Sequence, residues 1–331
     1  MTAGTLHVVV SCKSRKTVDV PANLRMSTVR GVDLSERMRD WVMRLQTTRS
    51  VEVPASGMYG GDHWRVILRI PEAAGRQLDV RLWVVSAGYG LVSIDTQLKP
   101  YSATFIPSHA ESIAPRFCAY STADWWRELG RWRPVAYGGP RTLDELATSL
   151  MGRRDVLLLA LSQPYALALR EDIASAERKA SGRVALVSVG LAAVENRSTL
   201  ASLLPVEARL KQRVGGAMQG VNGRIAEMMV REHAKWFPSV DKLRALVCEW
   251  VADAPALPIY DRAVQSEDEV RQFIRDHAKP DQVSSRTGML RALRDSGRAC
   301  EQSRFRRLYD EVMEMAGSTL APSPEAGSTG K

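Results

Sequence analysis

The sequence predicts an α/β protein in which a largely parallel, mixed sheet is flanked by helices and followed by a helical C-terminal region. Two observations lead to this prediction. Strand-like segments rich in Val and Leu alternate with segments of helical periodicity through the first two thirds of the chain. The last third has helical periodicity and ends in two short helical segments around the turn residues 295–297. That pair has the build of a helix-turn-helix-like hairpin.

Four segments are predicted to be strands of the sheet, because β-branched and other apolar residues dominate them. They are Leu6–Val10, Leu78–Val85, Asp155–Leu161 and Arg183–Gly190. The helices predicted between and around them are Leu34–Thr47, Asp62–Ile70, Thr142–Met151 and Pro164–Lys179. Asp33 is placed to cap the first of these helices, and Thr142 has the spacing of a capping box with Glu145.

Three of the predicted strands end in polar or glycine-rich loops. These loops are Ser11-Cys12-Lys13, Ser86–Gly90 and Ser162–Tyr165. Ligands of open α/β sheets bind at the carboxyl ends of the strands. The sequence therefore predicts that the three loops converge there on a site.

The chain is expected to have four parts. Residues 1–200 form the α/β core with the site, and residues 201–278 form a helical extension packed on it. Residues 279–315 form a basic helical hairpin, and residues 316–331, rich in Pro, Ser and Gly, form a disordered tail.

Composition narrows the class of protein. The chain has 331 residues, a net charge of +9 and a pI near 9.6, so a polyanion such as nucleic acid is the first partner to expect. Four scattered cysteines without a CxxC pair argue against a zinc site or a disulfide framework, and neither metal nor cofactor is expected. No apolar run approaches the roughly 20 residues of a membrane span. We expect a cytoplasmic protein with no membrane partner.

The C-terminal hairpin carries the densest positive charge. Residues 279–307 hold eight basic and three acidic residues. Arginines and helix N-termini can bind phosphates without reading bases. The residues predicted to contact DNA phosphates are Lys16, Arg224, Arg286, Arg291, Arg294, Arg298 and Arg304. The alternative is a solvated hairpin that buries Leu290, Leu293, Phe305 and Leu308.

Residues 86–105 bring a small-residue loop, aromatic rings, a carboxylate and a lysine close together in sequence. Cleavage of an N-glycosidic bond passes through an oxocarbenium-like sugar, which a carboxylate such as Asp95 can stabilise. Asp62 is the second candidate carboxylate, although loop aspartates more often cap turns. His63, next to it, is a candidate proton shuttle that more often lies at a surface. The residues predicted to form the base and sugar pocket are Ser11, Cys12, Lys13, Tyr59, Ser86, Gly88, Tyr89, Tyr101 and Asn222.

The string Ser86-Ala-Gly-Tyr-Gly-Leu-Val-Ser-Ile-Asp95, continuing through Lys99-Pro-Tyr101, resembles the hallmark of YaaA-like DNA-binding proteins. It is also similar to a related family of bacterial phage-defence domains. Residues 11–16 resemble the family's first strand-end loop, and residues 55–64 resemble its Tyr-Gly and Trp element. The elements occur in the family's order between residues 7 and 105.

The resemblance implies an α/β fold distantly similar to uracil-DNA-glycosylase-like domains and binding to double-stranded DNA. It further implies a monofunctional, metal-independent glycosylase of phage defence. Such an enzyme excises a glucosylated hydroxymethylcytosine from modified phage DNA by base flipping and leaves an abasic site. The first loop departs from the usual family pattern, which leaves the roles of Lys13 and Lys16 open.

Two other functions stay open. One is a DNA-binding stress or defence protein without turnover. The other is a relative of the enzymes that exchange a guanine-type base in tRNA. The absence of that family's zinc-ligand cysteine cluster weighs against the latter.

Overall fold

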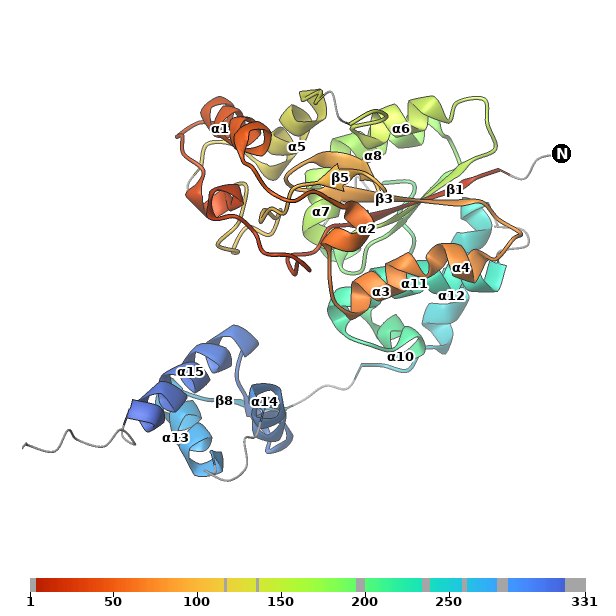
Figure 1. Ribbon diagram of the computed structural model, residues 1–331. Coiled ribbons are helices and arrows are strands. Elements are labelled where there is room, and N and C mark those ends of the chain that lie inside the picture. The colour runs from red at the N-terminus through yellow and green to blue at the C-terminus, as the bar shows by residue number, and fades with distance from the viewer. Residues whose placement is uncertain are drawn as a thin grey trace, which may run out of the picture. The chain divides into compact units, whose positions relative to one another are not determined.

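The chain forms two compact units, residues 1–257 and 258–331, each with its own hydrophobic core. The computed structural model describes residues 4–115, 118–134, 137–194, 200–233, 239–257, 261–278 and 285–318. The division differs from the expected boundary at residue 279. Helix α13 (Glu267–His277), expected in the extension packed on the core, belongs to the second unit (Figure 1).

A five-stranded sheet in the order β4-β3-β1-β6-β7 forms the centre of the first unit. Its parallel strands are β1 (Leu6–Ser11), β3 (Val80–Ser86), β6 (Val156–Ala160) and β7 (Val184–Val187). The edge strand β4 (Gly90–Ser93) runs antiparallel to β3. The predicted largely parallel, mixed α/β sheet is thereby confirmed. All six residues of β1 are buried, as expected for a strand covered on both faces.

Helices cover both faces of the sheet (Figure 1). One set consists of α3 (Asp62–Leu68), α4 (Ile70–Ala74), α11 (Val221–His233) and α12 (Val240–Asp253). The other consists of α1 (Leu34–Thr47), α5 (Thr122–Arg131), α6 (Leu143–Ser149) and α8 (Arg170–Lys179). Shorter elements are β2 (Val53–Pro54), α2 (Ala55–Met58), β5 (Gln97–Leu98), α7 (Gln163–Ala168), α9 (Leu191–Val194) and α10 (Lys211–Val214).

Local signals explain where several helices begin. The Asp33 side chain accepts a hydrogen bond from the Glu36 amide at 2.8 Å, which confirms the predicted cap of α1. Thr142 caps α6 by accepting from the Glu145 amide, but the predicted reciprocal half of the capping box is wrong. The Glu145 carboxylate accepts instead from the Arg141 amide and pairs with Arg133. The single helix predicted over Pro164–Lys179 is divided into α7 and α8 at residue 169.

The second unit is a three-helix assembly. It contains α13, α14 (Arg286–Asp295) and α15 (Gln302–Ser318), with the short parallel strands β8 (Ala263–Val264) and β9 (Arg298–Ala299). The apolar residues predicted for the hairpin core are buried, and residues of α13 such as Phe273 pack with them. Residues 319–331 of the predicted disordered tail lie outside the described residues.

We expect Phe305→Ala to destabilise the second unit alone. Phe305 is fully buried in that unit's core, so the cavity should cost about 3–5 kcal/mol. Hydrogen exchange followed by mass spectrometry should show lost protection in residues 261–318 and unchanged protection in the sheet. The exposed Arg306→Ala serves as the control. Equal loss of protection in both units would contradict the division.

Candidate functional site

The three predicted strand-end loops meet at the carboxyl edge of the parallel strands. The Ser162 amide donates to Ser11 Oγ at 3.0 Å, and Cys12 Sγ lies 3.1 Å from the Tyr165 hydroxyl. The backbone amide of Cys12 donates to the Val85 carbonyl at 3.0 Å, next to the third loop. These contacts confirm the predicted convergence. We call this group of side chains the strand-end cluster, which comprises Ser11, Cys12, Lys13, Lys16, Tyr59, His63, Ser86, Tyr101 and Tyr165.

Buried hydroxyls connect the cluster. The Tyr101 hydroxyl lies 2.9 Å from that of Tyr59 and 2.7 Å from Ser86 Oγ. Ser86 Oγ also accepts from the Tyr89 amide at 2.9 Å. A side chain at Gly88 would place its Cβ 2.6 Å from the Tyr101 ring, so this close approach requires glycine. The Tyr89 hydroxyl points elsewhere and donates to the Lys99 carbonyl.

Lys16 lies against two of these tyrosines. Its Nζ is 4.8 Å from the centre of the Tyr59 ring and 4.7 Å from that of Tyr101. The same atom donates to the Lys13 carbonyl at 2.5 Å. Burial lowers the pKa of Lys16 to about 8, because water no longer stabilises the ammonium. At neutral pH roughly a tenth of this amine is therefore uncharged.

The pKa values of the tyrosines in the cluster are shifted upward, in the direction opposite to that of Lys16. Burial raises the pKa of Tyr59, Tyr101 and Tyr165 well above the ordinary value, so all three stay protonated. Their hydroxyls are bonded within the cluster, to one another, to Ser86 and to Cys12. Tyr165 was predicted from the sequence as the last residue of the strand-end loop Ser162–Tyr165, but not as one of the pocket residues.

A second part of the cluster lies beside the first turn of α11. Lys13 Nζ donates to the Gln219 carbonyl at 2.9 Å. Burial, followed by the nearby charge of Lys13, lowers the pKa of His63 to about 4, so its imidazole is neutral. Asn222 accepts from the Val189 amide at 3.0 Å and donates to the Leu161 carbonyl at 2.8 Å. Asn222 therefore ties the ends of β6 and β7 to α11, a structural role that occupies the amide predicted for the pocket.

Asp95 lies away from the strand-end cluster. It is exposed and follows β4, where the Ile94 amide donates to the Leu82 carbonyl of β3. It lines a pocket of about 400 Å³ with Arg81 and Trp83, and no cluster residue lines that pocket. Because β4 runs antiparallel to β3, the chain after it returns toward the amino ends of the parallel strands. The predicted placement of Asp95 at the pocket of the three loops is wrong.

Asp62 lies at the margin of the cluster and is already paired. Its carboxylate contacts Arg224 and lies 3.8 Å from Arg65. The hydrogen bond from Arg224 lowers the pKa of Asp62. Within the described ranges, no carboxylate hydrogen-bonds to Lys16, Cys12 or the three tyrosines. The cluster thus holds amines, hydroxyls and a thiol in place of the expected catalytic carboxylate.

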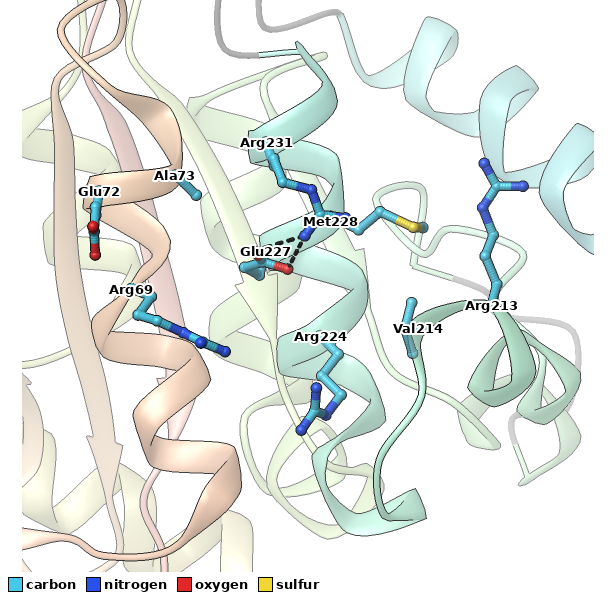
Figure 2. Close-up of a pocket in the computed structure, with 9 residues that line it drawn as sticks. All are labelled: Arg69, Glu72, Ala73, Arg213, Val214, Arg224, Glu227, Met228 and Arg231. Atoms are coloured by element: carbon cyan, nitrogen blue, oxygen red, sulfur yellow. Dashed lines mark hydrogen bonds and ion pairs between the residues drawn. The ribbon is translucent and has the colours of Figure 1, made fainter.

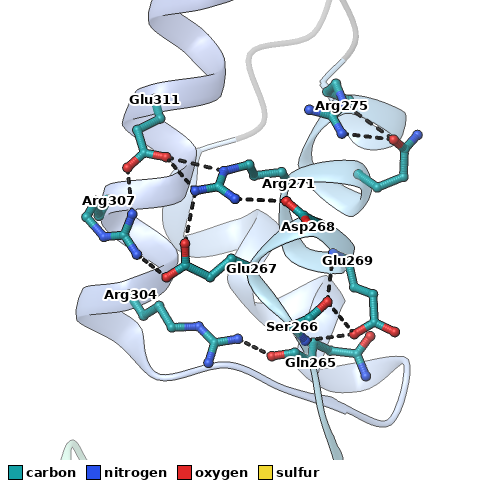
Figure 3. Close-up of polar contacts among 11 residues, drawn as sticks. Gln265, Ser266, Glu267, Asp268, Glu269, Arg271, Arg275, Arg304, Arg307 and Glu311 are labelled. Carbon is teal, nitrogen blue, oxygen red and sulfur yellow. Dashed lines mark hydrogen bonds and ion pairs between the residues drawn. The ribbon is translucent and has the colours of Figure 1, made fainter.

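Four of the five C-terminal arginines predicted to contact DNA have partners within their own unit. Figure 3 shows one of them, Arg304, with the carbonyl of Gln265. The second unit as a whole carries no net charge, because residues 258–331 contain 12 basic and 12 acidic residues. Among the described residues, Arg286 is the one predicted arginine of this unit that pairs with a carboxylate. Arg286 pairs with Asp310 at 3.4 Å, and Arg298 lies over the Phe273 ring. Arg294 donates to the Cys300 carbonyl, and Arg304 donates to the Gln265 carbonyl. The exposed Arg291 makes no ion pair with a described residue.

Comparison with models of protein families, with curated proteins and with solved structures finds no match. The resemblance to YaaA-like proteins therefore stays a prediction. Among the described residues, no group of three or more His, Cys, Asp or Glu side chains is placed to hold a metal ion. In that same part of the chain, no helix has both the length and the apolar character to cross a membrane.

Replacement of Lys16 should change how stability depends on pH. The pKa of Lys16 in the folded chain, about 8, lies below the ordinary 10.5, so the unfolded chain binds more protons between these values. The free energy of unfolding of the wild type should therefore rise by about 2 kcal/mol from pH 7.5 to 9.5 because of this group. Lys16→Met should lack that part of the rise in urea unfolding experiments.

Lys13 also has a lowered pKa, but it contributes equally to both proteins and cancels in the comparison. Above pH 10 the raised tyrosine pKa values act in the opposite direction, which sets the upper end of the window. The same pH dependence in wild type and Lys16→Met would show that Lys16 titrates normally.

Proposed function

We propose that this chain is a DNA-binding N-glycosylase that acts at the strand-end cluster, with the amine of Lys16 as its reactive group. One observation carries the proposal: the Lys16 amine is held against two tyrosine rings where the parallel strands end, with no carboxylate bonded to it among the described residues. Its lowered pKa makes part of this amine nucleophilic at neutral pH.

The geometry favours an amine over a water-activating carboxylate. In the proposed step, the neutral amine attacks C1′ of the sugar while the C1′–N bond breaks and its electron pair leaves with the base. A proton is needed on the departing base, and the protonated hydroxyl of Tyr59 or Tyr101 is a suitable donor. The nitrogen that attacked returns one proton to the tyrosinate and passes its second proton to O4′ as the sugar ring opens, which gives an imine between C1′ and Lys16. Water then hydrolyses this imine to an abasic site and the free amine. This route replaces the monofunctional mechanism expected from the sequence.

The base is proposed from the resemblance alone. Some of the phage-defence proteins that the sequence resembles look like glycosylases of hypermodified cytosine, so a glucosylated hydroxymethylcytosine in phage DNA is the first substrate to test. A flipped base binds by stacking and by hydrogen bonds at its edge. Because the Tyr59 and Tyr101 rings are buried, the proposed contact with the sugar is made by the Lys16 amine that lies against them. An antiviral role for the protein follows from that substrate.

The test is borohydride trapping of the imine. Wild-type protein is incubated with duplexes that carry glucosylated hydroxymethylcytosine, hydroxymethylcytosine, cytosine or uracil, and is then reduced. We expect one modified duplex to give a covalent adduct and alkali-labile sites. Lys16→Met and Lys16→Arg should lose both by at least a hundredfold, because arginine keeps the charge but forms no imine.

Asp95→Asn is the matched control and should retain full activity, since Asp95 is exposed outside the cluster. Base release by Lys16→Arg at the wild-type rate would overturn the role of Lys16. Loss of activity in Asp95→Asn with normal folding would restore the carboxylate mechanism.

A DNA-binding protein without turnover is the second candidate. It is favoured by the hydrogen bonds of Lys16 Nζ to the Lys13 and Ser14 carbonyls, at 2.5 and 3.5 Å. In that case Lys16 only holds the loop after β1 in shape. Salt-dependent DNA binding without adducts or alkali-labile sites on any duplex would decide for this candidate.

A further inference from the structure

The net positive charge of this protein belongs to the first unit. Residues 258–331 are electrically neutral, so the whole surplus of +9, with 34 basic against 25 acidic residues, belongs to residues 1–257. A polyanion is attracted by uncompensated charge, and charges already paired in salt bridges contribute little to its binding. A phosphate-binding surface is therefore to be sought on the α/β unit.

A groove of about 510 Å³ on that unit is lined by four arginines. We call it the arginine groove; it crosses α11 between the α3–α4 corner and α10, as Figure 2 shows. Its charged lining residues are Arg69, Glu72, Arg213, Arg224, Glu227 and Arg231. The groove is open to solvent, and exposed polar atoms dominate its lining, which suits a hydrated anion better than an apolar ligand.

Two of the four arginines are compensated and two are not. Arg231 pairs with Glu227 at 2.8 Å, and Arg224 pairs with Asp62. By contrast, neither Arg69 nor Arg213 makes an ion pair with a described residue. Both are exposed, and the Arg213 guanidinium lies 5.2 Å from the centre of the Trp250 ring. The two uncompensated guanidinium groups belong to opposite sides of α11 (Figure 2).

We infer that the arginine groove binds the phosphodiester backbone of nucleic acid, with Arg69 and Arg213 as the phosphate contacts. A guanidinium binds phosphate oxygens through parallel N–H donors and needs no base contact to do so. Arginines on opposite sides of one helix fit a ligand that presents successive phosphates, as a nucleic acid strand does.

The groove adjoins the strand-end cluster. Arg224, which lines the groove, pairs with Asp62, the residue before His63 of the cluster. Lys13 of the cluster donates to Gln219, immediately before α11. A strand held in the groove would therefore pass beside the cluster. This inference rests on the proposed function, because it supplies the backbone contacts for a base that reaches the cluster.

The test measures how DNA affinity depends on salt. A fluorescent 20-base-pair duplex is titrated with the full chain at several NaCl concentrations. Each lost phosphate contact makes the slope of log K against log [NaCl] less steep by about 0.9. The slope of Arg69→Ala/Arg213→Ala should therefore be less steep than that of the wild type by about 2. The matched control Arg286→Ala/Arg307→Ala removes the same charge from the second unit, where both arginines are ion-paired, and should leave the slope unchanged.

The remaining outcomes separate the two proposals. If the wild type binds the duplex and Arg69→Ala/Arg213→Ala shows the same salt slope, the inference about the groove is overturned and the proposed function stays intact. If the slope becomes shallower only in the control variant, the phosphate contacts lie in the second unit. A wild type that binds no duplex would overturn both. Competition by millimolar pyrophosphate without duplex binding would show that the groove takes free phosphates and contradict a nucleic acid ligand. Circular dichroism of each variant excludes unfolding as the cause.

Discussion

The pairing of β1 with β3 on one side and β6 on the other is the constraint on which the site depends. Parallel strands place their carboxyl ends at one edge, so the loops that follow them must share that edge. Ser11 and Cys12 leave the central strand and reach both neighbours, through Ser162 and through Val85. A residue that follows an antiparallel strand is carried away from this edge, and Asp95 is such a residue.

Desolvation gives the strand-end cluster its chemistry. The same burial disfavours the ammonium of Lys16 and the phenolates of Tyr59 and Tyr101. Part of the amine is therefore uncharged at neutral pH, and both hydroxyls keep their protons. A carboxylate in contact with Lys16 would favour the charged amine and raise its pKa. The position of Asp62, paired with Arg224, is therefore consistent with a cluster whose amine is partly neutral.

The sequence was sufficient for the architecture and for the convergence of the loops, because both follow from the alternation of strands and helices. It was insufficient for Asp95, because β4 is only four residues long and its antiparallel direction depends on a hairpin that the pattern did not reveal. The sequence was also insufficient for the partners of the C-terminal arginines, because α13 supplies some of them. Helix α13, expected in the extension packed on the core, belongs to the second unit, and its acidic first turn supplies Glu267 to Arg307 of the hairpin.

Helix α11 joins the cluster and the arginine groove through one turn. Asn222 and Arg224 are two residues apart, which places their side chains about 200° apart around the helix axis. One side chain can therefore hold the ends of β6 and β7 while the other lines the groove. Between them Gly223 lets the helix approach His63, because a Cβ there would lie 2.6 Å from the imidazole Cε1. A larger residue at position 223 would have to displace the side chains of His63 and Ile67 on α3, so this glycine sets how closely α11 packs against α3 beside both sites.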